Sequence, residues 1–309
     1  MSEKLTNLDA AESAFFLREL EHVKARTYDR KYEQFKAREL IPVNRSAGPG
    51  AESITYQSFS KVGIAKIIAN YADDLPRADV FGQEFTSPVK SIGDSFGYNV
   101  QEVRAAEMAN RPLKDMKAKA AKRGALAREE TIAAIGDAQT GLGGLLNNAN
   151  VTAVAAAAKA ATGGTTWADP ATAAEMLADL HTLWNIPYAA TNGHETIDTI
   201  LLPPAQYALI ATTQNSAASD KTVLQYFMEH YRALGVTAVL PWSQCSGVGG
   251  VDIAYGYKRS DEYCTLEVPQ DFEMFPPQAR NLEIIVPCHQ RTGGVLIYYP
   301  IAFGILTGI

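Results

Sequence analysis

The sequence predicts an α+β fold, in which helices and short strands alternate along the chain. Three observations support this class. Polar and apolar residues alternate over 54–59, which is typical of a half-buried strand. Residues 112–135 are rich in Ala, Lys, Arg and Glu, which are strong helix formers. From residue 264 onward, strand-like segments are separated by prolines, as in short strands joined by turns.

The composition indicates a soluble globular chain. Of its 309 residues, 47% are hydrophobic and 20% are charged, which excludes a fully disordered or fibrous protein. The longest uncharged apolar stretch, 295–309, is shorter than the roughly 18–20 residues that a membrane span needs. Charged residues precede the first apolar run, so we expect no signal peptide. Cys245, Cys264 and Cys288 are too widely spaced for a CxxC zinc site and favour a reducing compartment.

The charges divide the chain into two unlike parts. Its 28 basic and 34 acidic residues give a net charge of −6. Residues 1–140 hold 21 basic and 20 acidic side chains (21 − 20 = +1), and residues 141–309 hold 7 and 14 (7 − 14 = −7). There is no strongly basic patch, so base-specific recognition of nucleic acid is not expected.

The first hundred residues contain too little apolar sequence to form a core of their own. Residues 8–38 predict one charged helix with a single apolar stripe, which is typical of a helix that lies on another surface. Segments 54–59, 80–85 and 88–92 predict a long two-stranded excursion, and an isolated hairpin is only marginally stable. We therefore expect this region to bury its apolar side chains on a neighbouring copy of the chain.

Two helices are expected next. Asn99 to Ala109 predicts a short helix, and Pro112, which suits a first turn, starts a long one that ends at Gly136-Asp137. At a rise of about 1.5 Å per residue, the second helix is roughly 36 Å long. Its apolar positions are mostly small and predict close packing on a sheet or another helix. They are Leu113, Met116, Ala120, Ala127 and Ala134.

The remaining chain predicts alternating elements. Gly141 to Asn148 is a glycine-rich loop, and residues 151–163 are either a surface helix or a mobile segment. Asp169-Pro170 opens an amphipathic helix that extends to Asn185. Two further helices are expected at 204–212 and about 220–232. Strands are expected at 197–202, 236–240, 251–257, 264–268, 282–287 and 295–301.

One motif is similar to a catalytic site. Gly93-Asp94-Ser95-Phe96-Gly97 matches the G-x-S-x-G nucleophile elbow, and an acid and then His289 follow in the order of a hydrolase triad. The elbow needs a buried central strand before it, but residues 87–92 contain a proline and a lysine. A serine esterase that uses Ser95 is therefore the least favoured hypothesis.

No other pattern indicates chemistry. The glycines at 141–144 follow a helix and lack a Walker lysine, so they do not predict a phosphate site. The five histidines are scattered, and the carboxylates do not cluster as in a metal site or a two-carboxylate site. We therefore predict no catalytic residue, no metal and no cofactor. The glycine-rich joints instead predict hinges at Gly48, Pro49, Gly50, Gly143 and Gly144.

The order of the elements and two short motifs point to a known family. Gly144-Leu145-Leu146-Asn147 follows the long helix, and Arg291-Thr292-Gly293-Gly294-Val295 precedes a final Gly308-Ile309. In these features the chain resembles the major capsid proteins of tailed bacteriophages, whose fold is also found in encapsulin shells. The resemblance implies an N-terminal arm (1–53), an extended β-hairpin called the E-loop (54–98), a spine helix with the start of the peripheral domain (99–145), a mainly axial domain (146–260) and C-terminal strands that return to the peripheral domain (261–309).

The resemblance also implies a function. The chain would be a structural subunit, not an enzyme, that assembles through exchange of its arm and E-loop into an icosahedral capsid enclosing double-stranded DNA. Its partners would be other copies in hexamers and pentamers, the packaged DNA through non-specific contacts, a portal protein, and scaffolding or decoration proteins, but no membrane. It would be found in the virion after assembly in the host cytoplasm. The alternative is an encapsulin-type nanocompartment shell around a protein cargo.

Overall fold

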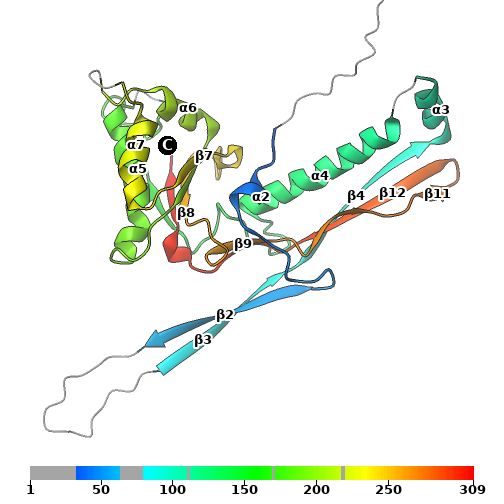
Figure 1. Ribbon diagram of the computed structural model, residues 1–309, viewed down its shortest axis with the longest axis horizontal. Coiled ribbons are helices and arrows are strands. Elements are labelled where there is room, and N and C mark those ends of the chain that lie inside the picture. The colour runs from blue at the N-terminus through cyan, green and yellow to red at the C-terminus, as the bar shows by residue number, and fades with distance from the viewer. Residues whose placement is uncertain (1–32, 63–78, 110–111, 169–170, 217–219) are drawn as a thin grey trace, which may run out of the picture. The chain divides into compact units, whose positions relative to one another are not determined.

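The computed structural model of the protein describes residues 33–62, 79–109, 112–168, 171–216 and 220–309. The chain divides into two units, Met1–Gln34 and Phe35–Ile309, and the elements described below belong to the second. Helices and strands are mixed along it, which confirms the α+β prediction (Figure 1). Most of the helix expected over 8–38 lies outside the described residues, and the described part of it contains only α2 (Ala37–Leu40).

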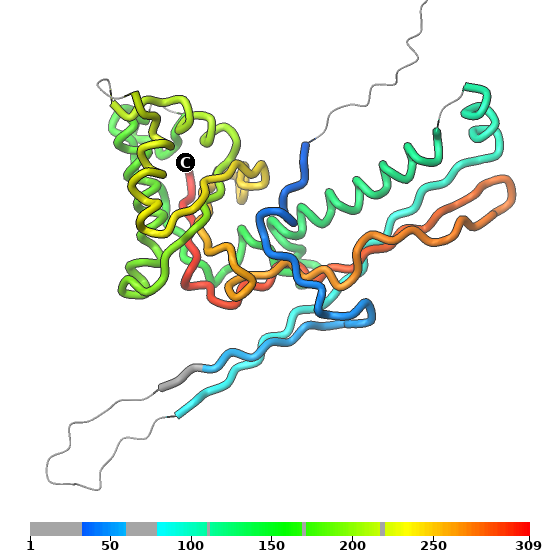
Figure 2. The backbone as a smooth tube through the Cα atoms, viewed as in Figure 1, coloured from blue at the N-terminus to red at the C-terminus, as the bar shows by residue number. Residues whose placement is uncertain are grey.

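The first two long strands form a hairpin of their own. β2 (Ser53–Val62) pairs antiparallel with β3 (Asp79–Pro88), from Ser53 opposite Pro88 to Val62 opposite Asp79. Within the described ranges, neither strand pairs with a third. The predicted two-stranded excursion is therefore present, as Figures 1 and 2 show.

The third long strand belongs to a different sheet. β4 (Lys90–Asn99) pairs antiparallel with β12 (Glu283–Thr292) along its whole length, and β10 (Gln270–Met274) and β11 (Gln278–Arg280) pair with the other edge of β12. In Figure 2, β4 and β12 run beside each other along the long helix α4 (Leu113–Ile135). The sequence predicted only the first half of β12 and missed β10 and β11, whose residues are mostly exposed.

The two helices after β4 match their predicted ranges. Asn99 caps α3 (Val100–Met108) by accepting a hydrogen bond from the Glu102 backbone N–H at 2.7 Å, and the Glu102 carboxylate accepts one from the Asn99 N–H at 3.2 Å. α4 has 23 residues and ends where Gly136 adopts a φ of +68°. A Cβ atom at Gly136 would overlap the Leu142 carbonyl oxygen, so only glycine fits this turn.

A five-stranded mixed sheet forms the base of the C-terminal half. Its order is β5–β14–β8–β6–β7, with bounds Thr152–Ala155, Gly304–Thr307, Ile253–Tyr257, Thr199–Leu202 and Ala238–Pro241. The expectation of a surface helix or a mobile segment at 151–163 is wrong at β5. Parallel pairing with β14 holds these alanine-rich residues extended, although alanine itself favours a helix.

Three helices pack beside this sheet. α5 (Ala173–Ala190) contacts β14 and β8, and it starts at Thr172, whose side chain forms a capping box with Glu175. The predicted helix is therefore present, but it extends beyond its predicted end at Asn185, through Pro187, to Ala190. Its predicted start at Asp169-Pro170 lies outside the described residues. The other helical segments are α6 (Pro204–Thr212), α7 (Val223–Tyr231) and 3₁₀ turns at Arg232–Leu234, Ser243–Cys245 and Pro300–Ala302.

Two hydrophobic clusters lie on opposite faces of the five-stranded sheet. Leu201 and Tyr255 belong to one cluster and Ile200 and Ala254 to the other, as the alternation of side chains along β6 and β8 requires. The first cluster also contains Leu40 of α2, together with residues of a three-stranded sheet. That sheet has the order β1 (Val43–Asn44), β9 (Cys264–Glu267) and β13 (Gly294–Ile297).

Candidate assembly surfaces

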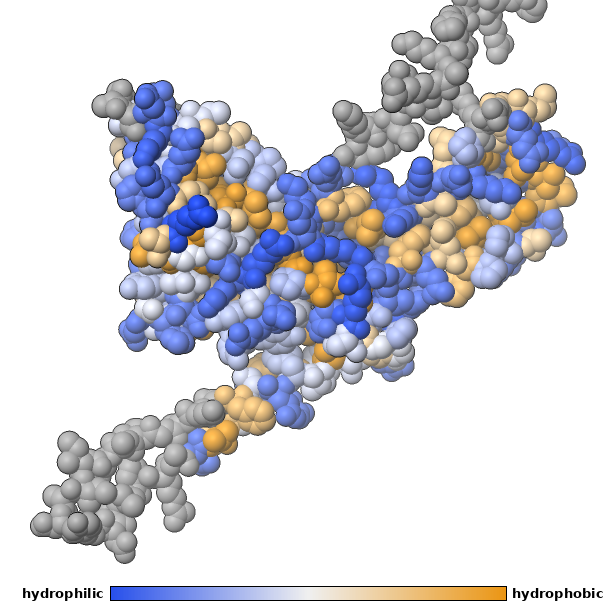
Figure 3. Space-filling view, viewed as in Figure 1, coloured by the Kyte–Doolittle hydropathy of each residue, from blue (hydrophilic) through white to orange (hydrophobic). Residues whose placement is uncertain are grey.

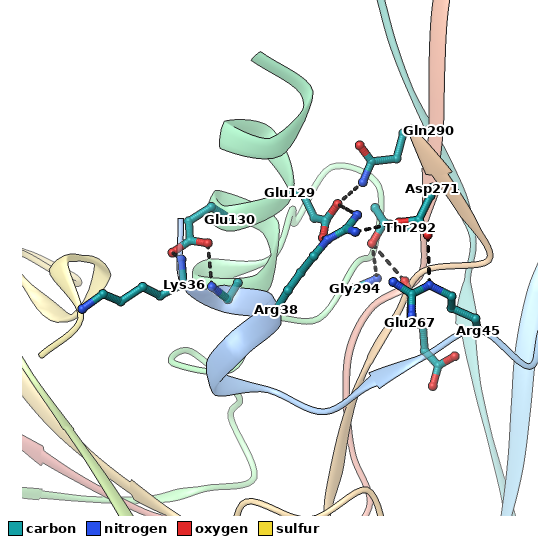
Figure 4. Close-up of polar contacts among 11 residues, drawn as sticks. Lys36, Arg38, Arg45, Glu129, Glu130, Glu267, Asp271, Gln290, Thr292 and Gly294 are labelled. Atoms are coloured by element: carbon teal, nitrogen blue, oxygen red, sulfur yellow. Dashed lines mark hydrogen bonds and ion pairs between the residues drawn. The ribbon is translucent and has the colours of Figure 1, made fainter. Parts of the chain in front are cut away.

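Two adjacent glutamates near the end of α4 hold Lys36, Ala37 and Arg38. Glu130 is buried, and its carboxylate accepts hydrogen bonds from the backbone N–H groups of Lys36 at 3.1 Å and Ala37 at 2.8 Å (Figure 4). The Trp242 indole N–H donates to the same carboxylate at 2.6 Å. Glu130 therefore satisfies N–H groups that the start of α2 would otherwise leave unpaired.

Glu129 holds the same segment through side chains. Its buried carboxylate pairs with the Arg38 guanidinium at 2.6 and 2.8 Å and accepts a hydrogen bond from Gln290. Arg38 also contacts Asp271 at 2.6 Å, and Arg45 contacts Asp271 at 3.0 Å. The hydrogen bond to Glu129 raises the pKa of Arg38 above its ordinary value, so the guanidinium stays charged. We call the contacts that hold residues 36–45 the arm anchor.

Backbone and hydroxyl contacts extend the arm anchor. β1 pairs parallel with β9, and the Tyr257 hydroxyl donates to the Leu40 carbonyl at 2.6 Å. The Asn44 amide donates to the Glu267 carboxylate at 3.0 Å. Residues 36–44 are therefore held by α4, β8 and β9, which all lie far from this segment in the sequence.

The ion pairs at Asp271 predict a small acid-sensitive contribution to stability. Burial raises the pKa of Asp271, but the hydrogen bonds and charges of Arg38 and Arg45 outweigh it and lower the pKa below its ordinary value. Because the folded pKa lies below the unfolded one, this stabilisation is present above the unfolded pKa of about 3.9 and is lost as the pH falls through the folded pKa.

Replacing Asp271 with asparagine is therefore expected to lower the free energy of unfolding at neutral pH by about 0.2–1 kcal/mol, since the pair is half exposed. Denaturant titration at about pH 7 and about pH 2 measures the effect, which should be smaller at the lower pH, where more of the Asp271 carboxylate is protonated. Equal destabilisation at both pH values would contradict the assignment.

The β2–β3 hairpin exposes large apolar side chains. Residues Asp79 to Thr86 of β3 are all exposed. Figure 3 shows hydrophobic surface at the outer end of the described part of the hairpin. The exposed fractions are 63% for Phe59, 57% for Val80, 60% for Phe81 and 38% for Phe85. Aromatic side chains gathered on one thin ribbon indicate a surface that another molecule covers.

The inner end of the hairpin is attached to the sheets. Tyr56 stacks on Phe85 with ring centroids 5.2 Å apart and meets Tyr298 edge-on at 4.8 Å. The Ser87 hydroxyl donates to the Gly293 carbonyl at 3.3 Å. Beside these contacts lies a groove of about 490 Å³, lined by the hairpin base, the loop after α4 and β13. The hairpin is therefore held at its base and exposed at its outer end.

A comparison with family models accounts for this combination of an anchored start, an exposed hairpin and a long helix. The model described as "Major capsid protein" matches residues 63–309, which is most of the chain. The chain belongs to the major capsid protein family. A search of curated proteins found no match.

Solved capsid structures share the fold of this major capsid protein. The capsid of Myoviridae phage XM1 matches with a TM-score of 0.83 at 19% identity, covering 99% of this chain and 100% of that chain. The capsid of a native GTA particle matches with a TM-score of 0.65 at 12% identity, covering 98% of this chain and 99% of that chain. A virus-like particle from Pyrococcus furiosus matches with a TM-score of 0.57 at 14% identity, covering 87% of this chain and 90% of that chain. The capsid fold predicted from the sequence is confirmed.

The capsid protein is a structural subunit of a capsid shell made of many copies, and so a component of the virion. The catalytic alternative fails on geometry. Ser95 lies inside β4, with Pro287 of β12 opposite it in the ladder, and not in a turn between a strand and a helix. The esterase hypothesis is wrong in its structural premise, because no nucleophile elbow forms at Ser95.

Other chemistry-bearing side chains of the capsid protein do not form a site in the described residues. Across those ranges, no three His, Cys, Asp or Glu side chains are placed to hold a metal ion, and no helix is long and apolar enough to span a bilayer. All three cysteines are buried. Burial raises the pKa of Cys264 to about 12 and also raises that of Cys245, so neither is a nucleophile at neutral pH.

The predicted hinge residues of the capsid protein occupy two kinds of environment. Residues 48–50 lie exposed before β2, and a Cβ atom at either glycine would meet nothing within 4 Å. Gly144 is buried, and a Cβ atom there would overlap the backbone of Ile135 and Gly136. At Gly143 it would lie 2.9 Å from the Val295 carbonyl oxygen. Close packing explains the glycines at 143 and 144, and bending at all five positions stays a prediction.

Sequence analysis missed the arm anchor. Glutamate is common on exposed helix surfaces, so a helical pattern does not mark a buried one. One signal is present. Glu129 and Glu130 come near the C-terminal end of α4, where negative charge opposes the helix dipole, and the last turn has no basic residue. Such a pair indicates cations or N–H donors from another segment.

Proposed function

We propose that this capsid protein assembles into a closed icosahedral shell by exchanging its N-terminal arm (1–53) and its E-loop (54–98) between copies, and that the shell encloses double-stranded DNA. The exposed apolar side chains of the β2–β3 hairpin are the observation that carries the proposal. Burying one such side chain contributes about 1.5–3 kcal/mol. Because the family forms shells of many copies, a neighbouring subunit is the surface available to bury them.

The dimensions of the hairpin support exchange. Each strand has ten residues. At a rise of about 3.3 Å per residue, such a strand spans roughly 33 Å, enough to reach across part of an adjacent subunit. A two-stranded ribbon is only marginally stable alone, so contact with a neighbour would also stabilise the hairpin itself. Many modest contacts of this kind add up to a stable shell.

The remaining parts follow the family layout in this proposal. Residues 99–145 form the spine helix and the start of the peripheral domain, 146–260 form most of the axial domain, and 261–309 return to the peripheral domain. The pairing of β12 with β4 supports the last assignment. Closed shells place one chain in slightly different environments, and the glycine-containing joints at 48–50 and 143–144 are the proposed places of bending.

Double-stranded DNA is the proposed content for two reasons. The XM1 match, named as a phage capsid, has a TM-score of 0.83, compared with 0.57 for the virus-like particle. The first 140 residues carry a net charge of only +1, which tolerates a polyanion better than the −7 of the rest. Portal, scaffolding and decoration proteins, and assembly in a host cytoplasm, belong to the same proposal.

Electron microscopy and sedimentation of the purified full-length protein test the assembly. We expect pentamers, hexamers or closed shells. The Phe81→Ser variant should keep its circular dichroism spectrum and raise the concentration needed for assembly by about tenfold or more, because each lost contact is worth about 1.5–3 kcal/mol. Gln57→Ser, at an exposed polar position of the same hairpin, is the matched control and should assemble normally. A wild-type monomer that persists at high concentration would reject the proposal.

The content of native particles separates a virion from a nanocompartment. Particles purified from the producing cells are treated with nuclease and then opened. Nuclease-protected double-stranded DNA of uniform length is the expected result. A stoichiometric cargo protein without such DNA would favour the encapsulin-type shell instead.

A further inference from the structure

We infer that the outer end of the β2–β3 hairpin is covered on both of its faces by neighbouring copies, whereas its middle contacts a neighbour through one face only. This inference rests on the proposed function, because it takes hairpin exchange between copies as given. It adds which face of which residues is covered.

The strand register assigns the side chains to two faces. Tyr56 lies opposite Phe85, and Phe81, four residues from Phe85 on β3, shares their face. We call this the aromatic face. Phe59 and Val80 lie an odd number of residues from these and therefore on the opposite face. We call that face the polar face, because its middle is polar.

The middle of the polar face needs no partner. The Thr55 and Thr86 hydroxyl oxygens are hydrogen-bonded to each other at 2.9 Å, and the Gln57 amide donates to the Glu84 carboxylate at 2.6 Å. These side chains are exposed and satisfy one another across the strands. They are compatible with water, so this part of the hairpin is expected to be covered only over the aromatic face.

The outer end differs because both of its faces carry exposed apolar side chains. Phe81 is 60% exposed on the aromatic face, and Phe59 and Val80 are 63% and 57% exposed on the polar face. The Phe59 ring already covers Gly82, the residue opposite it, yet most of its surface remains accessible. A ribbon one layer thick cannot bury both faces on itself, and one flat surface covers only one of them. The end of the hairpin therefore fits between two surfaces.

A second copy of this chain is the occupant that the observations favour. At the base of the hairpin, Tyr56 packs its side of the aromatic face against Tyr298, so this face is already in contact with protein there. Lys61, Asp79 and Glu84 give the two strands a net charge of 1 − 2 = −1, which does not suit DNA or an acidic membrane. The family forms shells of many copies, so protein surfaces of the same kind surround each hairpin.

The reactivity of single introduced cysteines measures whether each face of the hairpin is covered in assembled particles. The three native cysteines are buried, which keeps background labelling low. Cysteine is introduced separately at Phe81 on the aromatic face, at Phe59 on the polar face and at Gln57 as the control. Maleimide labelling rates are then compared between dissociated subunits and closed particles. We expect the rate to fall by about tenfold or more at positions 59 and 81 and by less than about twofold at position 57.

The outcomes separate the inference from the proposed function. If position 81 is protected and position 59 is not, only one face is covered, so the inference fails while hairpin exchange stands. If neither is protected in closed particles, hairpin exchange itself fails. If Phe59→Cys does not assemble, Val80→Cys on the same face replaces it. Loss of assembly in both variants, with unchanged circular dichroism of the subunits, supports the inference, and protection of position 57 as strong as that of 59 overturns it.

Discussion

Replacing Asp179 with alanine is expected to destabilise the capsid protein by about 3–5 kcal/mol, the range for removing one partner of a buried ion pair. The side chains of Lys159 and Asp179 are only 1% and 3% exposed. One oxygen of the Asp179 carboxylate accepts hydrogen bonds from the Lys159 ammonium and, at 2.7 Å, from the Trp167 indole N–H. Without the carboxylate, a buried positive charge and a buried donor lose their acceptor.

The loss of stability in Asp179→Ala should extend to the loop that contains Lys159. The Lys159 backbone N–H donates to the Gly164 carbonyl at 2.6 Å, and Trp167 packs in the same hydrophobic cluster as Leu180 of α5. Urea denaturation followed by circular dichroism, below the concentration at which subunits assemble, measures the change. Alanine has a higher helix propensity than aspartate, and this gain on α5 offsets at most about 0.7 kcal/mol of the destabilisation.

A double variant distinguishes the ion pair from packing. Lys159→Met with Asp179→Leu replaces both charges by apolar side chains of similar size, an exchange that is often neutral or stabilising in buried pairs. We expect it to recover the part of the lost stability that comes from the unpaired Lys159 charge, but not the part that comes from the Trp167 indole N–H, which still lacks an acceptor. If Asp179→Ala alone changes the free energy of unfolding by less than about 1 kcal/mol, the charge is not held as the contacts imply.

The elements that the sequence predicted well are determined by local interactions. α4 was predicted almost residue by residue because its Ala, Lys, Arg and Glu residues favour a helix. Gly136 ends this helix regardless of what the helix packs against. The hairpin was predicted because alternation over 54–59 is a local pattern. The buried face of α4 was less well predicted. Of the predicted positions, Ala134 is buried but Met116 is 43% exposed, and the other small residues that pack are Ala121, Ala125 and Ala133.

The elements that the sequence missed depend on contacts between distant residues. β5 is a strand because β14 lies beside it, although its own residues favour a helix. β4 pairs with β12, which is why Ser95 lies in a ladder and not at a turn. A single sequence holds no record of which strands meet, so the G-x-S-x-G match could be weakened by its flanking residues but not dismissed.

The two candidate assembly surfaces, the exposed hairpin and the arm anchor, also differ in whether local sequence predicts them. The exposure of the hairpin followed from its shortage of apolar residues, which is a property of composition. The arm anchor could not be derived in that way, because Glu129 and Glu130 have the same local signature as exposed helix residues. Only the positions of α2, Trp242 and Gln290 of β12 around them show that both carboxylates are buried and hydrogen-bonded.

Replacing Glu130 with alanine is expected to release the arm anchor at a cost of about 2–5 kcal/mol. Glu130 is 4% exposed and accepts from three donors, the N–H groups of Lys36 and Ala37 and the indole of Trp242. Each buried donor left without a partner costs about 1–3 kcal/mol, and the Lys36 N–H, being partly buried, can turn to water. Urea denaturation measures the global loss.

Hydrogen exchange decides whether the loss is local. Leu266 and Val268 of the β9 region donate to the carbonyl oxygens of Pro42 and Asn44, so their amides report whether residues 36–44 stay in place. We expect faster exchange at these two amides in Glu130→Ala. The protection of amides in β6 and β8 should fall only as much as the global free energy of unfolding does. Lys119→Ala, at an exposed position of the same helix, is the matched control and should change neither quantity. Normal protection at Leu266 and Val268 in Glu130→Ala would mean that the backbone pairing of β1 holds this segment without the carboxylate.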